Sequence, residues 1–155
     1  MAHSLIFEIT ENPYDVDEWI EEDTFFESDF IGSVAEYVSD TTIEERPENI
    51  ARLRKFVGDG FEVAKDADTY TIKVLPGGKQ KYFKSKFREL KAQVGAMTVE
   101  DYCDEMNAWR LMMLISDKFS LYVYQNGTYR TIDNFVRNIA ENRIYYIGGI
   151  VGYKY

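Results

Sequence analysis

The sequence predicts a single compact α+β domain over residues 1–155, with a largely antiparallel sheet and about four to five helices. Its 155 residues suit one hydrophobic core. Its composition, 45% hydrophobic and 15% aromatic with three prolines, is typical of a packed protein and not of a disordered chain. Hairpin signals alternate irregularly with helical ones, which favours antiparallel strands over repeated parallel units.

The first third predicts one strand followed by two helices. Residues 4–10, SLIFEIT, alternate in the manner of a strand. Residues 29–38 have the apolar spacing of a short amphipathic helix. A second helix is expected over residues 47–57, because Pro47 suits a first helical turn and Gly58 suits a C-terminal cap.

Two hairpins and a final strand account for the predicted sheet. Runs of β-branched and aromatic residues flank Asp66-Ala67-Asp68, and similar runs flank Asn126-Gly127, the strongest short hairpin signal. A short helix is expected over residues 133–140. The last residues, 143–155, predict an aromatic strand or strand pair, and we interpret its tyrosines as core or sheet residues rather than as a stacking platform: Tyr145, Tyr146, Tyr153 and Tyr155.

A helix over residues 79–94 carries two neighbouring stripes. One is apolar and is expected to face the core: Phe83, Phe87, Leu90 and Val94. The other is cationic and is expected to be solvated or to pair with acids of the same chain: Lys81, Lys84, Arg88 and Lys91. A nucleic-acid contact is disfavoured for this stripe because the whole chain has a net charge of −9.

The next helix is expected over residues 98–113. Thr98 and Asp101 have the spacing of a capping box. Cys103 lies on the apolar side of the predicted helix, so we expect it in the core. Arg110 falls in the same stripe and must reach a carboxylate or extend to solvent.

Several function classes are disfavoured by what the sequence lacks. It has no apolar run long enough for a membrane span and no signal-peptide pattern, and its single cysteine rules out an internal disulfide, so we expect a cytoplasmic protein. His3 is the only histidine, which disfavours zinc sites and histidine-based catalysis. We therefore predict no catalytic residues, no metal ligands and no cofactor, and an enzyme is the less favoured class.

Charge is distributed very unevenly along the chain. Residues 1–50 hold 15 acidic residues and one basic residue, Arg46, whereas residues 51–155 hold 12 acidic and 17 basic residues. Half of the residues from 15 to 30, DVDEWIEEDTFFESDF, are carboxylates, yet four are aromatic. Aromatic side chains can anchor such a segment to the core while the carboxylates stay outside.

We therefore predict that this acidic segment, residues 15–30, binds a basic protein surface. Its candidate contacts are Asp15, Asp17, Glu18, Glu21, Glu22, Asp23, Glu27 and Asp29, with a possible extension to Asp101, Asp104 and Glu105. The competing interpretation is that the cationic stripe of residues 81–91 neutralises these acids internally. A groove built for nucleic acid is the natural basic target, which would make the protein a nucleic-acid mimic without direct nucleic-acid or membrane binding.

In general character this resembles the acidic inhibitors that phages and other mobile genetic elements carry against restriction or RNA-guided nucleases. The resemblance covers composition and charge, and no sequence motif carries it. It implies a protein that inhibits a host-defence nuclease by occupying its nucleic-acid groove. Oligomeric state does not follow from the sequence.

Two alternative functions stay open. The turn Gly77-Gly78-Lys79 leads from a predicted strand into a helix and could present amides and a positive charge to a phosphate, as in a small-molecule or nucleotide sensor. A metal-dependent hydrolase with carboxylate-only ligands would leave no sequence signature. Asp15-Val16-Asp17 begins like a calcium loop, but Trp19 and Ile20 occupy positions that a ligand and a glycine should fill.

Overall fold

Strand β7 (Ile144–Lys154) organises the sheet because it has neighbours along both edges. The computed structural model describes residues 2–155, and these form one α+β domain around a mostly antiparallel sheet. Strand order is β3-β4-β7-β1-β5-β6, and β2 pairs with the far end of β7. The other strands are β1 (His3–Thr10), β2 (Tyr37–Asp40), β3 (Phe61–Asp66), β4 (Thr69–Val74), β5 (Tyr122–Gln125) and β6 (Thr128–Thr131).

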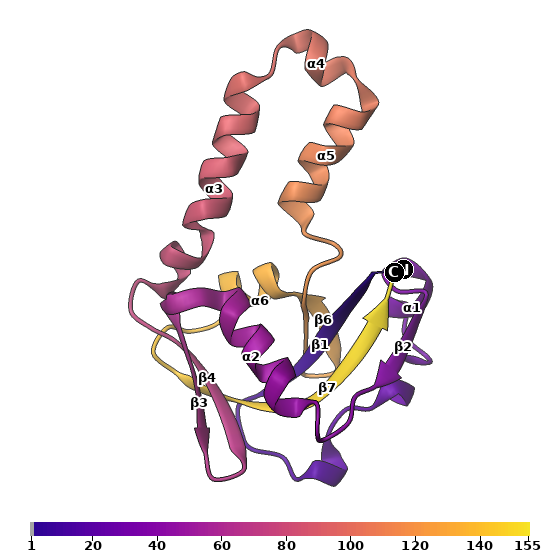
Figure 1. Cartoon of the computed structure of the whole chain (residues 1–155), viewed down its shortest axis with the longest axis vertical. Helices are drawn as coiled ribbons and strands as arrows, with labels where there is room; N and C mark the ends of the chain where they lie inside the picture. The colour runs from indigo at the N-terminus through magenta and orange to yellow at the C-terminus, as the bar shows by residue number, and fades with distance from the viewer. Residues whose placement is uncertain (1) are drawn as a thin grey trace.

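The helices lie on and beyond this sheet (Figure 1). Six α-helices occur in the described chain, against the four to five expected, because the helix predicted over residues 98–113 is divided in two. They are α1 (Phe30–Ser33), α2 (Arg46–Val57), α3 (Gly78–Ala96), α4 (Val99–Cys103), α5 (Glu105–Ser116) and α6 (Ile132–Asn138). Short 3-10 turns cover Val16–Glu18 (η1), Glu22–Phe25 (η2) and Gly58–Gly60 (η3).

Both predicted hairpins are confirmed, and their turn residues have the backbone angles that the turn chemistry requires. Asn126 and Gly127 have φ of 53° and 80°, and Ala67 has φ of 54°. Helix α2 ends at Gly58 with φ of 74°, as its glycine predicted. The capping box of Thr98 and Asp101 is also present, with hydrogen bonds in both directions.

One predicted element is wrong. Residues 29–38 do not form an amphipathic helix: Gly32 turns the chain with φ of 101° after a single helical turn, and residues 37–40 then form β2. Pairing of β2 with β7 outweighs the helical spacing of its apolar residues, because that pairing satisfies the backbone and buries Val38 against the sheet.

The core has two parts, one on each face of β1 and β7. Helices α2 and α6 cover the first face, where Phe7, Leu53 and Phe135 are fully buried. The acidic segment and α1 cover the second face, where Ile6, Phe25 and Phe30 are fully buried. Strand β1 is therefore buried on both sides, and residues 15–30 form part of a core layer. Of the C-terminal tyrosines, Tyr145 and Tyr153 are buried as expected and the other two are half-buried.

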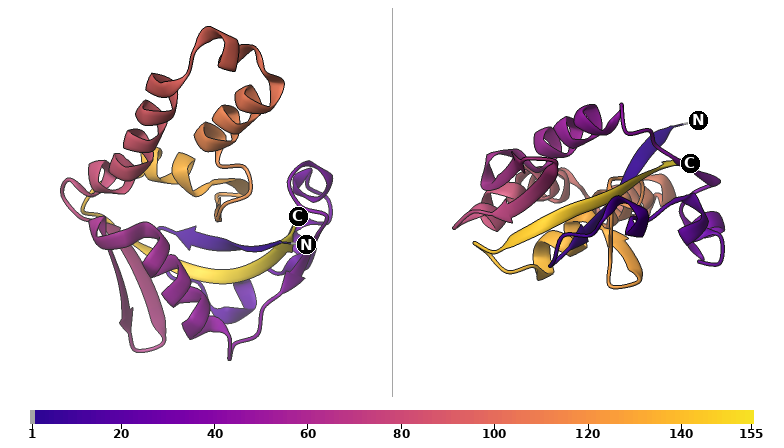
Figure 2. Two further views of the ribbon diagram at one scale, coloured as in Figure 1. Left: turned by 45° about the horizontal axis from the view of Figure 1, so that its top comes forward. Right: turned by 90° about the horizontal axis from the view of Figure 1, so that it is seen from below.

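A helical arm stands away from this body. Figure 2 shows α3 rising from one end of the sheet and α5 returning, with α4 between them at the tip. Cys103 was expected in the core but is exposed, because the predicted helix breaks at Asp104 and the arm contains no core at this height. Phe87 and Val94 were likewise expected to be buried, but they are 60% and 51% exposed. Helical spacing predicts a shared face, but not what covers it.

Candidate acidic interface

The acidic segment has an ordered backbone made of two short turns. The amide of Glu18 donates to the carbonyl of Asp15 at 2.9 Å in η1, and the amide of Thr24 donates to the carbonyl of Glu21 at 3.1 Å in η2. The hydroxyl of Thr24 accepts a further bond from the amide of Glu21 at 3.1 Å, which caps the second turn. These local bonds set the direction of the neighbouring side chains.

Two phenylalanines anchor the segment. Phe25 and Phe30 are fully buried, with ring centroids 5.5 Å apart. Phe30 meets the edges of Tyr122, Tyr129 and Tyr153 at centroid distances of 5.1, 4.8 and 5.3 Å. Such tilted contacts are favourable beyond the area they bury. The anchors are real, but Phe26 is 59% exposed and takes no part in them.

A buried carboxylate ties the same segment to β7, at the point where the pairing of β7 with β1 shifts register. Glu8 is 5% exposed, and its Oε1 accepts hydrogen bonds from the amides of Ile20 at 3.2 Å and Gly149 at 3.0 Å. The glycine pair allows this approach, because a Cβ on Gly148 would lie 2.4 Å from Glu8 Oε1 and a Cβ on Gly149 would lie 2.6 Å from the carbonyl oxygen of Ile20. The acidic segment is therefore held at Ile20, whose backbone amide shares the Glu8 carboxylate with the amide of Gly149.

Arg46 is the second polar anchor. Its guanidinium donates to the carbonyls of Gly148 at 2.6 Å and Ile147 at 2.8 Å, and it stacks over the ring of Trp19 at 4.1 Å. Burial lowers the pKa of Arg46 below its ordinary value, partly offset by Tyr70. Arg46 is the only basic residue among the first 50. The one cation close in sequence to the acidic segment therefore serves to anchor that segment.

The predicted contact residues lie outside this anchored core. Among the eight, Glu22 is half-buried and the other seven are exposed: Asp15, Asp17, Glu18, Glu21, Asp23, Glu27 and Asp29. Two of them are braced by hydrogen bonds. Asp29 accepts from the hydroxyl of Tyr129 at 2.7 Å, and Glu22 exchanges side-chain to backbone bonds with Asp40 at 2.7 and 3.2 Å.

The cationic stripe does not neutralise these acids. Within residues 2–155, the ion pairs join Lys86 to Asp117 and Asp133, and Arg143 to Glu11. Lys81, Lys84, Arg88 and Lys91 are exposed on α3, in the arm, whereas the dark turns of the acidic segment lie along the bottom and the right side of the view, away from α3 (Figure 1). Compensation within the chain is therefore not part of this structure.

The predicted extension of the acidic surface lies elsewhere. Asp101 and Asp104 lie at the tip of the arm, where they accept hydrogen bonds from helix-terminal amides, and Glu105 begins α5 beside them. Figure 1 shows α4 at the far end from the acidic segment, so the structure does not bring these acids together with residues 15–30.

Packing accounts for the Gly77-Gly78-Lys79 turn. Gly77 adopts φ of 75°, and a Cβ on Gly78 would lie 2.1 Å from the carbonyl oxygen of Gly60. The amide of Gly78 donates to the carbonyl of Leu75 at 2.7 Å, and the Lys79 ammonium donates to the carbonyl of Arg137 at 3.2 Å. The glycines thus let the start of α3 contact η3, and the lysine joins α3 to α6.

Carboxylates do not converge in the part of the chain that the structure describes. No group of three acidic, histidine or cysteine side chains there could hold a metal ion. In the same residues, no helix is long and apolar enough to cross a bilayer. The described residues therefore add no metal site to the acidic segment of residues 15–30.

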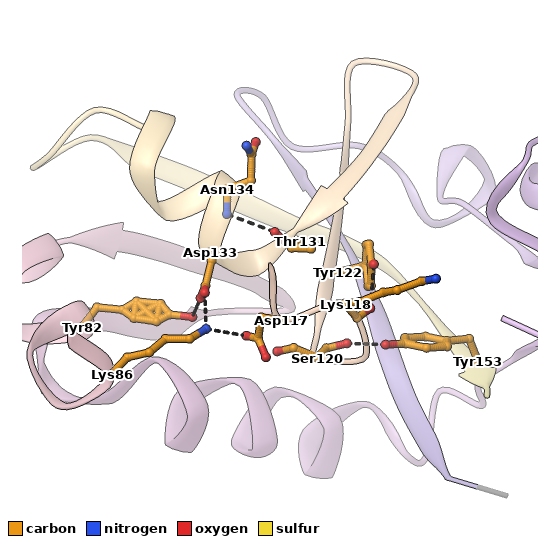
Figure 3. A network of polar contacts seen from close by, with 10 residues as sticks. All are labelled: Tyr82, Lys86, Asp117, Lys118, Ser120, Tyr122, Thr131, Asp133, Asn134 and Tyr153. Carbon is orange, nitrogen blue, oxygen red and sulfur yellow. Dashed lines mark hydrogen bonds and ion pairs between the residues drawn. The ribbon is translucent and has the colours of Figure 1, made fainter. Parts of the chain in front are cut away.

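A polar network at the foot of the arm had no signal in the sequence. Asp133 is 1% exposed, and it accepts hydrogen bonds from the hydroxyl of Tyr82 at 2.7 Å and from the ammonium of Lys86 (Figure 3). Lys86 also pairs with Asp117 at 3.0 Å. Burial and Asp133 raise the pKa of Tyr82 well above its ordinary value. Tyr82 and Lys86 lie one helical turn apart on α3, which lets them share Asp133 as a partner.

Comparisons with protein-family models, with curated proteins and with solved structures gave no match to this chain.

Proposed function

We propose that this protein is a non-enzymatic binding protein that presents the acidic segment to a basic partner. The observation that carries the proposal is the combination of buried anchors and free carboxylates: Phe25 and Phe30 are fully buried, while seven of the eight candidate acids are exposed. Within residues 2–155, none of these eight forms an ion pair.

Fixed charges favour recognition in a way that a flexible acidic tail does not. A tail must lose conformational freedom on binding, whereas an anchored segment has already lost it during folding. Ordered negative charge also steers a basic partner and orients it before contact. The hydrogen bonds of Asp29 and Glu22 support this, because they hold carboxylates in place without neutralising them.

The partner class that fits best is a protein whose groove normally holds nucleic acid. Such grooves are lined with lysine and arginine against phosphates spaced a few ångströms apart, and ordered carboxylates can occupy the same positions. We propose inhibition of a nucleic-acid-binding protein, such as a host-defence nuclease, in the cytoplasm and in the setting of a mobile genetic element. The exposed ring of Phe26 lies between Phe25 and Glu27 and offers an apolar contact within the charged surface.

A four-fold charge reversal tests the proposal. We would reverse Asp17, Glu18, Asp23 and Glu27 to lysine, and compare this variant with a control of equal charge change away from the segment: Asp59→Lys, Glu62→Lys, Asp68→Lys and Glu141→Lys. All eight side chains are exposed, so both variants should fold. Each protein is immobilised and used to capture proteins from a cytoplasmic extract.

The expected result is capture of basic, nucleic-acid-binding proteins by the wild type and the control, and their release by added duplex DNA or by salt. The segment variant should capture them at least tenfold less. Equal capture by both variants, or captured proteins that DNA does not displace, would contradict the proposal.

A further inference from the structure

The helical arm, residues 78–116, exposes apolar side chains that a monomer normally buries. Every residue of α4 and α5 is exposed or half-buried. Eight large apolar side chains of the arm are about half exposed or more: Phe87, Val94, Val99, Tyr102, Met106, Trp109, Met112 and Ile115. The three aromatic residues among them alone expose roughly 250–400 Å² at typical ring areas. These three residues lie on α3, α4 and α5, so exposed apolar side chains occur along the whole arm, as they do at many interaction surfaces.

The arm is held at its foot and not along its length. Tyr82 and Lys86 bind Asp133 of α6, which fixes α3 to the body, and Lys86 also binds Asp117 directly after α5, which joins the two legs of the arm at their foot (Figure 3). Gly78 packs against Gly60 at the same level. Above this foot, α5 carries Met106, Trp109, Met112 and Ile115, each about half exposed, and their spacing of three spreads them over about half of the helix circumference. A preorganised helix pair is therefore presented to solvent with a broad apolar side uncovered.

Charge on the arm is polarised from foot to tip. Residues 79–91 carry six basic residues and one acid, and residues 98–105 carry four acids and no base. The nearest residues of the two regions, 91 and 98, are seven positions apart, about 10 Å at a helical rise of 1.5 Å per residue. That separation exceeds the screening length of about 8 Å at physiological ionic strength, so the two ends do not neutralise one another.

We propose that the occupant of this apolar side is the arm of a second copy of the chain, packed antiparallel about a two-fold axis. In that orientation the acidic tip of each arm lies against the basic foot of the other, and both contacts are identical by symmetry. A parallel arrangement would place like charges together. Two helical pairs packed in this way bury the exposed rings and methionines in a four-helix bundle.

The polarity of the arm makes the pairing testable by charge exchange. One variant reverses the foot, Lys84→Glu with Arg88→Glu, and the other reverses the tip, Glu100→Lys with Glu105→Lys. These side chains are exposed, and Asp101 and Asp104 are left in place because they cap helices. A matched control, Arg52→Glu with Lys55→Glu, changes the same charge on exposed positions of α2.

Sedimentation equilibrium measures the result over a wide concentration range. We expect the wild type and the α2 control to dimerise, and each arm variant to show at least a tenfold higher dimer dissociation constant. An equimolar mixture of the foot and tip variants should recover the dimer, because each variant then meets opposite charge at both ends. The change Trp109→Ser should weaken the dimer without affecting helical content.

Three outcomes would overturn the pairing. A wild type that stays monomeric throughout, or a dimer that neither arm variant weakens, places no second copy on the arm. A dimer lost on reversing Asp17, Glu18, Asp23 and Glu27, while the arm variants keep it, would mean that acidic segments bind cationic stripes of neighbouring copies instead. The first two outcomes leave the proposed function untouched, because the capture experiment on the acidic segment does not depend on the arm. The third outcome would instead assign the acidic segment to self-association and would count against both proposals.

Discussion

The guanidinium of Arg46 lies 4.1 Å from the centre of the Trp19 ring while it donates to two carbonyls of β7. This arrangement couples the acidic segment to the central strand through a charge that has no carboxylate partner among the described residues. Because the backbone carbonyls and the ring face hold the cation, the surrounding acids stay free of it. The stability of the segment therefore depends on Arg46 more than on any surface ion pair.

Replacing Arg46 by methionine should destabilise the protein by about 2–4 kcal/mol. The change leaves the carbonyls of Ile147 and Gly148 without their donor in a buried position, and charge-assisted hydrogen bonds are among the stronger ones. Urea unfolding measures the loss. The exposed Arg52 provides the control, and its replacement by methionine should change stability by less than about 0.5 kcal/mol. Similar losses for both would contradict the anchoring role.

Two glycine-to-alanine changes should act in opposite directions. A Cβ on Gly149 would lie 2.6 Å from the backbone oxygen of Ile20, so Gly149→Ala must displace the acidic segment or β7 and should destabilise. Gly95 lies inside α3 with nothing within 4 Å of its added Cβ, so Gly95→Ala should stabilise by about 0.5–1 kcal/mol. The midpoints of thermal unfolding of the two variants and the wild type compare their stabilities. Faster hydrogen exchange at Ile20 in the Gly149 variant would locate the damage.

Removing the ammonium of Lys86 should cost about 3 kcal/mol or more. Asp133 is 1% exposed and would keep only the hydroxyl of Tyr82 as a partner, which leaves a buried carboxylate without its cation. The change Lys86→Met tests this by denaturant unfolding. Lys84→Met, two positions earlier on the exposed side, should be nearly neutral. Equal effects would show that the network does not support the arm.

Stability should fall in alkaline solution between about pH 10 and 12. Burial is the main cause that raises the pKa of Tyr122 and of Tyr129 to about 12, with Asp29 adding to the effect on Tyr129. Since the folded-state pKa exceeds the unfolded value of about 10, the protonated hydroxyls contribute their full stability below pH 10. That contribution disappears as the pH rises through about 12.

The phenolate absorbance measures this titration. Tyr129→Phe should remove one late-titrating group and reduce the loss of stability at high pH, whereas Tyr14→Phe, a change at an exposed side chain, should leave that loss of stability unchanged. Twelve tyrosines titrating together near pH 10 would contradict the burial argument.

The sequence predicted the parts of this fold that depend on local chemistry. Asn126-Gly127 and Gly58 require positive φ and adopt it, and Thr98 caps its helix as expected. The helix over residues 29–38 was wrong because strand pairing with β7 is a long-range contact that local spacing does not contain.

The sequence indicated which residues make up the candidate site, but not which contacts hold them in place. Aromatic residues among carboxylates indicated an anchored segment, and Phe25 and Phe30 are its anchors. Glu8 and Arg46 were not foreseen, since each acts through a backbone group more than 100 residues away in sequence, Gly149 for one and Gly148 for the other. The closeness of Glu8 to Gly149 follows from the pairing of β1 with β7, whose register shifts between Phe7 and Ile9, and local sequence patterns do not contain such a long-range pairing.

The pairing of β1 with β7 has a consequence for folding. Strand β1, His3–Thr10, pairs with β5 and β7, which are the segments from 122 to 125 and from 144 to 154. The centre of the sheet therefore closes only when segments more than 100 residues apart in sequence meet, and contacts of such long range make folding slow and leave Ile6, Phe7 and Ile9 unpaired until then.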